Sequence, residues 1–207
     1  AGRLEFSEIE NVIPCFTPGS MIATPRGEVP VETLRNGDHV ITRDNGIQEI
    51  RWTGSRTLNR TELAKAPNLR PVLIKAGALG HNLPERDMLV SPQHRVLVTG
   101  QTPQLYFEES EVLVPAKHLV GKQGVCSVET MRTTYVHFMF DQHEVVLSDG
   151  AWTESFQPGK QAMGAIGKAA RSEILALFPE LTTKTGLLDY TAARRSLKAH
   201  EAKLLQS

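Results

Sequence analysis

Short hydrophobic runs that end in turns dominate most of the chain. Between residues 21 and 52, four such runs are separated by Arg-Gly and Asn-Gly turns. Each run is too short to be a helix, and turns of this kind between alternating runs are typical of β-hairpins. We expect strands at 21–24, 29–34, 39–42, 47–52, 71–75, 87–90, 95–98, 111–115, 133–140 and 144–147. The pattern predicts an all-β barrel or sandwich.

The pattern changes after residue 156, where Gln157-Pro158-Gly159 interrupts the chain. Residues 160–178 have apolar positions at helical spacing up to Pro179, and residues 190–205 form a second amphipathic segment. A further helical turn or loop is expected at 58–69. We therefore expect three parts, listed in order: an N-terminal leaving segment at 1–14, a β-domain at 15–156 and a helical extension at 157–207.

Composition and charge narrow the possible functions. The chain has 207 residues, of which 40% are hydrophobic and 22% charged, and its formal net charge is zero. These values are ordinary for a globular domain, and nothing in the charge favours nucleic acid or an anionic membrane surface as a partner. No apolar run approaches the roughly 20 residues of a membrane-spanning helix. The first residues lack the features of a signal peptide, so the compartment stays open. We expect a monomer without a cofactor.

The two cysteines, Cys15 and Cys126, are too few for a disulfide framework. Without a CxxC pair, a structural zinc site built from cysteine pairs is excluded. Cys15 could be a free reactive thiol, or the two cysteines could form one bridge that switches Cys15 off. For Cys126 the simplest expectation is a small buried hydrophobic residue.

Cys15, with Pro14 before it, could carry out an acyl shift at its own peptide bond. This reaction needs a thiol next to the carbonyl, a proton donor for the leaving nitrogen and donors for the developing oxyanion. Cys15 would attack the Pro14 carbonyl, and His94 would protonate the nitrogen, since the pKa of histidine lies near neutrality. Ser91 would hydrogen-bond the Pro14 carbonyl or the amide itself.

His143 is a candidate base for the next nucleophile or for Cys15 itself, and Asp141, two residues earlier on the same strand face, could orient it. Taken singly, each of these residues also has a structural explanation, because buried cysteines and histidines are commonly part of a core. Two alternatives therefore stay open. One is an inert binding or assembly module, and the other is a metal site formed by Cys15, His94 and His143.

Three blocks in this order resemble Hint domains, which inteins share with Hedgehog autoprocessing domains. The opening block has the pattern Cys-Phe-x-x-Gly-Ser followed by Gly-Asp-x-Val, and the second has Ser in place of the Thr of a TxxH motif. The third is similar to the closing strands of the family. These blocks lie at Cys15–Ser20 with Gly37–Val40, at Ser91–His94, and at Tyr135–Gly150.

The resemblance implies a horseshoe-shaped all-β fold and an N–S acyl shift at Cys15 that yields a thioester, with Ser91 and His94 in the roles above. Several stretches resemble more narrowly a bacterial subfamily found at the end of larger, often secreted, proteins. These are Arg51-Trp52, Leu89–Arg95, Ser148–Ser155, Arg171–Pro179 and Ala192–Leu204.

Differences from the family pattern determine which reaction we expect. Glu154-Ser155 stands where inteins carry the His-Asn pair whose asparagine cyclises, so we expect N-terminal cleavage without splicing. No carboxylate stands at 54–56, near the place of the sterol-activating aspartate of Hedgehog proteins, so water, a thiol or another small nucleophile is expected as acceptor. Val136 stands where inteins often carry an aspartate. By analogy the helical extension selects the acceptor; alternatively, it simply packs on the β-domain.

Overall fold

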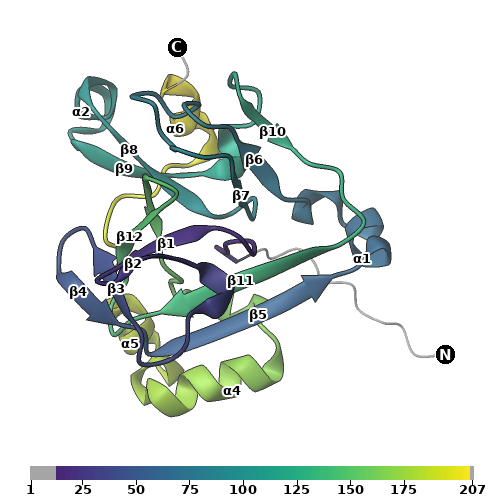
Figure 1. Cartoon of the computed structure of the whole chain (residues 1–207). Helices are drawn as coiled ribbons and strands as arrows, with labels where there is room; N and C mark the ends of the chain where they lie inside the picture. The colour runs from purple at the N-terminus through teal and green to yellow at the C-terminus, as the bar shows by residue number, and fades with distance from the viewer. Residues whose placement is uncertain (1–12, 206–207) are drawn as a thin grey trace.

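A computed structural model describes residues 13–205 and shows a fold made mostly of short strands (Figure 1). Segment 1–14, the predicted leaving segment, lies outside the described residues except for its last two positions. The strands are β1 (Met21–Thr24), β2 (Gly27–Pro30), β3 (His39–Thr42), β4 (Gly46–Glu49), β5 (Trp52–Leu58), β6 (Val72–Ile74), β7 (Met88–Val90), β8 (Arg95–Thr99), β9 (Glu111–Pro115), β10 (Val125–Ser127), β11 (Thr133–Met139), β12 (Val145–Ser148) and β13 (Ala151–Glu154).

These strands form three antiparallel sheets. The first has the order β2-β1-β12-β13-β8-β9 and is extended by β3 and β4. The second has the order β10-β6-β7, and the third is the long pair of β5 and β11, which crosses the whole molecule in Figure 1. Neighbours in a sheet are often distant in sequence, as β1 and β12 are, so closing the fold requires long-range pairing.

Most of the strands expected from the sequence are confirmed, although their bounds move by a few residues. The run at 29–34 is divided, because β2 ends at Pro30 and a short 3₁₀ turn, Val31–Thr33, follows. The run at 47–52 is also divided between β4 and β5. Strands β10 and β13 were not expected. Both are three or four residues long and are recognisable mainly through the partners they pair with.

The helices lie at the edges of the β-domain and in the C-terminal part. They are α1 (Arg60–Lys65), α2 (Gln101–Phe107), α3 (Lys160–Ala165), α4 (Lys168–Leu177), α5 (Lys184–Asp189) and α6 (Ala199–Ala202). The helical turn expected within 58–69 is α1, and its N-cap is Asn59, whose side chain accepts from the Glu62 amide at 3.1 Å. The helical run expected at 160–178 is present as α3 and α4, separated at Ile166 and Gly167.

The second amphipathic segment, 190–205, is helical only near its end, so this expectation was largely wrong. Arg195 and Leu197 instead bond to Leu113 of β9, with N–O distances of 2.8 and 2.9 Å. Leu197 is 3% exposed and packs among the strands. Pairing with a sheet edge thus outweighed the helical spacing of the side chains.

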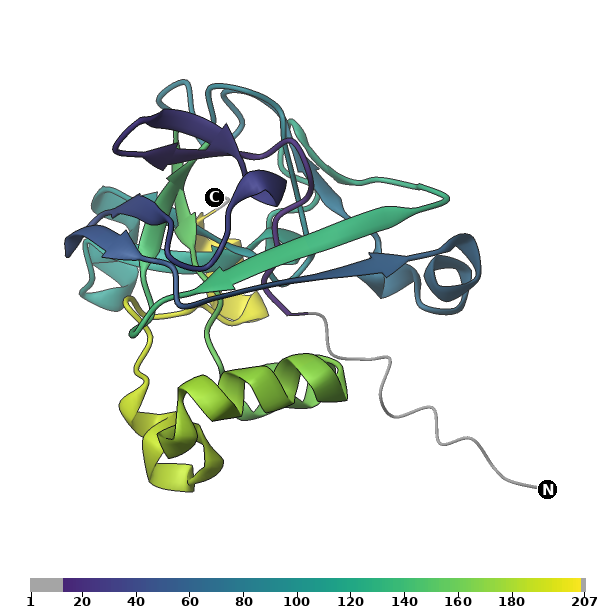
Figure 2. The same ribbon diagram turned by 60° about the horizontal axis from the view of Figure 1, so that its bottom comes forward.

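The helical extension covers the cluster of buried side chains that contains Cys15. In Figure 2, α4 runs alongside the β5–β11 pair. From the β-domain this cluster includes Ile13, Cys15, Trp52, Tyr135, Met139 and Phe156, and from the extension it includes Met163, Ile166, Ile174, Phe178, Leu181 and Tyr190. The extension is therefore part of the core around Cys15.

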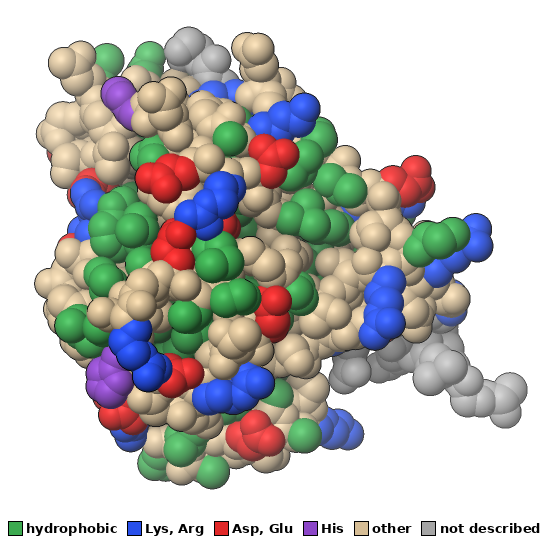
Figure 3. Space-filling view, in the orientation of Figure 1, with side chains coloured by type: hydrophobic (Ala, Val, Ile, Leu, Met, Phe, Trp, Pro, Cys, Tyr) green, Lys and Arg blue, Asp and Glu red, His purple; other side chains and the backbone are tan. Residues whose placement is uncertain are grey.

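On the face shown in Figure 3, basic and acidic side chains are interspersed among apolar ones. Neither sign forms a continuous field there, in keeping with the zero net charge. Within residues 13–205, no helix is both long and apolar enough to cross a membrane.

We predict that Ile174→Ala destabilises the protein by about 2–5 kcal/mol, because it leaves a cavity in the cluster around Cys15. Ile174 is fully buried, whereas Leu177, on the same helix, is 49% exposed. Leu177→Ala is the matched control and should change the free energy of unfolding by about 0.5 kcal/mol or less. Urea unfolding measures both. Equal effects would show that α4 does not pack as described.

Candidate active site

Cys15 is held in place because Phe16 pairs with strands on both sides. Phe16 and Val136 of β11 exchange two backbone hydrogen bonds, with N–O distances of 2.8 and 2.9 Å. On the other side, the amide of Ser91 donates to the Cys15 carbonyl at 3.0 Å, directly after β7. Cys15 and Phe16 thus lie at the junction of two sheets, and hydrogen bonds from both sheets fix their backbone.

The Ser91 hydroxyl bonds to the backbone of the two residues that flank Pro14. It accepts from the Cys15 amide at 2.9 Å and donates to the Ile13 carbonyl at 2.8 Å. Of the two targets expected for Ser91, the structure shows the amide, whereas the carbonyl it contacts belongs to Ile13 rather than Pro14. Ser91 is fully buried, so water does not compete for these bonds.

Cys15 is buried, with 1% of its surface exposed, and its thiol lies beside His137 of β11. Its Sγ is 3.4 Å from Nδ1 of His137 and 3.2 Å from the carbonyl oxygen of Ile13. His137 was not among the site residues expected from the sequence. One signal for it was available: His137 has the same strand parity as Tyr135 and Met139, and both of these pack in the Cys15 cluster.

His94 is fully buried and packs on Phe16, the residue after Cys15. Its ring contacts Phe16 edge-on, with ring centroids 4.4 Å apart. Among the described residues, neither ring nitrogen has a hydrogen-bond partner. Burying the nitrogens of an imidazole without hydrogen-bond partners costs free energy, and such groups often have a catalytic role.

His143 contacts a buried carboxylate and the C-terminal segment. Its Nδ1 accepts from the Ala193 amide at 2.9 Å, and its Nε2 lies 3.3 Å from Glu154. Glu154 in turn accepts from the amide and the guanidinium of Arg95, at 2.8 and 2.6 Å. Among the described residues, the polar contacts of His143 are with Ala193 and Glu154 rather than with Cys15. Glu154 was expected only as a replacement in the family pattern.

Asp141 is not placed to orient His143. Its side chain is 74% exposed and lies 3.3 Å from Nε of Arg51. The strand β11 ends at Met139, so the alternation assumed for residues 141 and 143 does not apply there.

Neither of the other arrangements considered for Cys15 forms in the described structure. Both cysteines are free, Cys15 buried and Cys126 exposed, so Cys126 is not the buried residue that was expected. Within residues 13–205, no group of three or more His, Cys, Asp or Glu side chains is arranged to hold a metal ion.

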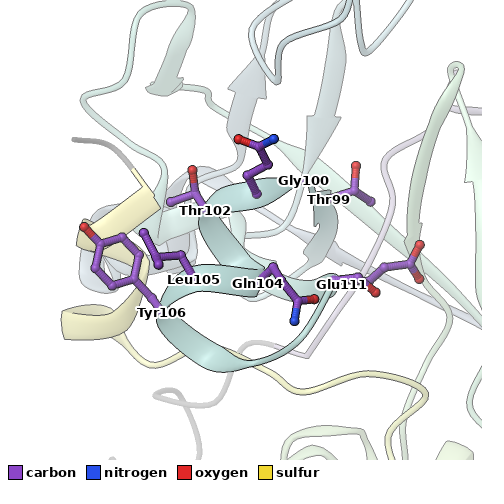
Figure 4. A pocket seen from close by; sticks show the side chains of 9 residues that line it. Thr99, Gly100, Thr102, Gln104, Leu105, Tyr106 and Glu111 are labelled. Carbon is purple, nitrogen blue, oxygen red and sulfur yellow. The ribbon is translucent and has the colours of Figure 1, made fainter.

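A surface hollow of about 1000 Å³ lies at α2, and no residue of the predicted site lines it. Figure 4 shows its side chains, which come from α2 and from the adjacent ends of β8 and β9. They include Thr99, Gln101, Gln104, Leu105, Tyr106 and Glu111. Cys15, by contrast, is enclosed.

Comparison with known proteins agrees with the family that the three sequence blocks indicate. A family model described as "Hint domain" matches residues 14–160. The chain belongs to the Hint domain family. The predicted family and the predicted fold class, an all-β Hint domain followed by a small helical extension, are both confirmed. Hint domains are in general self-processing domains.

Several solved structures resemble this Hint domain. A bacterial intein-like domain from Clostridium thermocellum is 16% identical, covers 70% of this chain and 99% of its own, and has a TM-score of 0.46. A DnaB intein from Synechocystis is 10% identical, with 69% and 98% coverage and a TM-score of 0.41. A search of curated proteins found no match.

Burial sets the protonation states in the site of this Hint domain. It raises the pKa of the Cys15 thiol well above its ordinary value, an effect that Ser91 partly opposes and the Glu154 charge reinforces. Burial also lowers the pKa of His94 and of His137 to about 4. Although burial alone would raise the pKa of Glu154, Arg95 and His143 hold it below its usual value. At neutral pH the site therefore contains a thiol, two neutral imidazoles and one ion pair.

We predict that this Hint domain loses stability as the pH falls from 6.5 towards 4. The unfolded chain binds protons at His94 and His137 near pH 6.5, whereas the folded chain does not until about pH 4. Each histidine then costs about 1.4 kcal/mol per pH unit in this window. Urea unfolding at several pH values measures the slope. In His94→Gln, unfolding takes up one proton fewer, so the slope of the free energy of unfolding against pH should decrease by about 1.4 kcal/mol per pH unit. An unchanged slope would contradict a neutral buried His94.

Proposed function

We propose that this domain cleaves its own Pro14–Cys15 bond by an N–S acyl shift followed by attack of a small nucleophile, without splicing. One observation carries the proposal. The Cys15 amide is held by the Ser91 hydroxyl at 2.9 Å, while the Cys15 sulfur lies 3.4 Å from a histidine nitrogen. The nucleophile and the leaving nitrogen of one peptide bond thus each have a polar partner in the interior.

In the first step, Nδ1 of His137 takes the thiol proton and Sγ attacks the carbonyl carbon of Pro14. A base adjacent to the nucleophile is the usual means of activating a thiol whose pKa is unfavourable. His137 suits this role because it is neutral above about pH 4 and its nitrogen lies close to the sulfur. This assignment replaces His143 as the base for Cys15, since the contacts of His143 are with Ala193 and Glu154.

In the second step, the bond between the Pro14 carbonyl carbon and the Cys15 nitrogen breaks, and the nitrogen gains a proton. We assign its delivery to His94, which packs on Phe16 and is not otherwise hydrogen-bonded within the described residues. We propose that His94, which is neutral, relays to the nitrogen the proton that His137 took from the thiol. The thiol loses one proton and the nitrogen gains one, so the shift is neutral overall. Ser91 keeps the nitrogen oriented throughout.

The thioester at Cys15 is then cleaved by water or a thiol. Splicing would require an asparagine that cyclises at the end of the domain, and Glu154-Ser155 stand there instead. Both side chains are fully buried and engaged, Glu154 with Arg95 and Ser155 with the Glu144 amide at 2.9 Å. We therefore propose that the reaction ends with release of the N-terminal segment.

The first test is the intact mass of the purified chain, incubated with and without dithiothreitol. We expect loss of the mass of residues 1–14, faster with the thiol because it attacks the thioester directly. Cys15→Ala should stay intact under both conditions. If the native chain also stays intact, the acyl shift does not occur, and the domain is better described as an inert binding or assembly module.

A second test uses the pH dependence of cleavage at saturating dithiothreitol, where thioester formation limits the rate. If His137 takes the proton, the rate should be constant between about pH 5.5 and 8 and should fall as His137 becomes protonated towards pH 4. In His137→Gln the thiolate must form through solvent, so the rate should rise about tenfold per pH unit. A native chain that already shows this rise would refute the role of His137.

A further inference from the structure

A row of side chains connects helix α4 of the extension to the Cys15 thiol. The indole N–H of Trp52 donates to Oε2 of Glu173 on α4 at 3.0 Å. The Trp52 ring stacks on the His137 ring, with centroids 5.1 Å apart and an interplanar angle of 23°. Nδ1 of His137 is 3.4 Å from Sγ of Cys15. Each member thus contacts the next, from the surface of α4 to the buried sulfur.

The absence of a side chain at Gly54 makes room for this row. Gly54 of β5 pairs directly with His137 of β11, while Trp52 pairs with Met139 two residues further along. A Cβ at Gly54 would lie 2.5 Å from Cη2 of Trp52 and 2.7 Å from Nε2 of His137. The two rings therefore occupy the space above Gly54, where the His137 ring has the Trp52 indole on one side.

We propose that Glu173 and Trp52 are positioning residues for the reaction at Cys15. The Glu173 carboxylate fixes the indole, and the indole holds the His137 ring where Nδ1 can take the thiol proton. This inference rests on the proposed function and deepens it, because it gives the helical extension a part in the chemistry. Neither residue touches the reacting atoms.

The contacts explain why such support is needed. Besides the sulfur, the His137 ring has two aromatic neighbours in the described structure, the Trp52 ring and the Phe156 ring, whose centroid is 5.6 Å away. Its orientation therefore depends on how these rings are held. The proton that moves from Sγ to Nδ1 also leaves a positive imidazolium against the face of an indole, a favourable place for a cation. Trp52 is 2% exposed and its ring nitrogen has Glu173 as partner, so rotation of the indole would break that hydrogen bond.

Glu173 offers a test because its side chain is exposed and the protein should stay folded without it. Its replacement leaves the Trp52 indole N–H without its partner, so we expect a loss of about 1 kcal/mol in the free energy of unfolding, measured by urea unfolding. Glu173→Ala should slow thioester formation about tenfold, the effect of one hydrogen bond. Glu173→Gln keeps an oxygen acceptor and should stay within about twofold of the native rate. Glu180→Ala, at an exposed position of the same extension, is the matched control and should react at the native rate.

A double-mutant cycle adds a readout that a general structural effect would not produce. Trp52→Phe keeps an aromatic ring but removes the N–H, so adding Glu173→Ala to it should slow the reaction no further. All rates are measured on the full chain by intact mass at saturating dithiothreitol.

The outcomes separate this inference from the proposed function. If the native chain does not cleave, the proposed function fails and the inference fails with it. If the native chain cleaves and Glu173→Ala reacts at the same rate, only the inference fails. Additive effects of Trp52→Phe and Glu173→Ala, or a failure of Glu173→Gln to restore the rate, would likewise overturn it.

Discussion

The pairing of Phe16 between β7 and β11 is the constraint on which the site depends. Two hydrogen bonds to Val136 and the bond from Ser91 to the Cys15 carbonyl fix the backbone on either side of the thiol. Because β7 and β11 belong to different sheets, this single residue connects them. The positions of Ser91, His94 and His137 relative to the Pro14–Cys15 bond follow from that connection.

The interior around this bond is poor in charge, and this shapes its chemistry. The thiol is hard to ionise and both imidazoles are hard to protonate, all because of burial. A proton moved from the sulfur to His137 would create two charges in a medium that solvates them weakly. The fixed charges that act there include the Glu154–Arg95 pair and Arg56, whose positive charge lowers the pKa of the Cys15 thiol. In such a site the proposed proton transfer is slow until something stabilises the separated charges.

The helical extension helps to form this interior. Side chains of α3 and α4 complete the cluster that encloses Cys15, and Glu173 holds the edge of Trp52. In the proposed reaction, a nucleophile would have to reach a sulfur that the extension helps to enclose. The same part of the chain that encloses the thiol also supplies the hydrogen bond to Trp52, so enclosure and the proposed positioning depend on one packing interface.

The sequence by itself determined the strands and the family, because both depend on local information. Hairpin turns and short alternating runs specify strands such as 21–24 and 111–115 without reference to distant residues. Motif spacing predicted Cys15, Ser91 and His94 as site residues, since each occupies a characteristic place in its block. The all-β domain with a helical extension followed from the change in periodicity after residue 156.

Only the tertiary structure decided which side chains meet at Cys15. His137 lies 122 residues from Cys15 in the sequence and reaches it because β11 pairs with Phe16, which no local pattern encodes. The same holds for His143, which contacts Glu154 and Ala193, and for residues 195–197, which pair with β9 although their spacing suggested a helix. In each case a long-range contact outweighed a local preference, because burial and pairing across the fold contribute more free energy than the preference of a single segment.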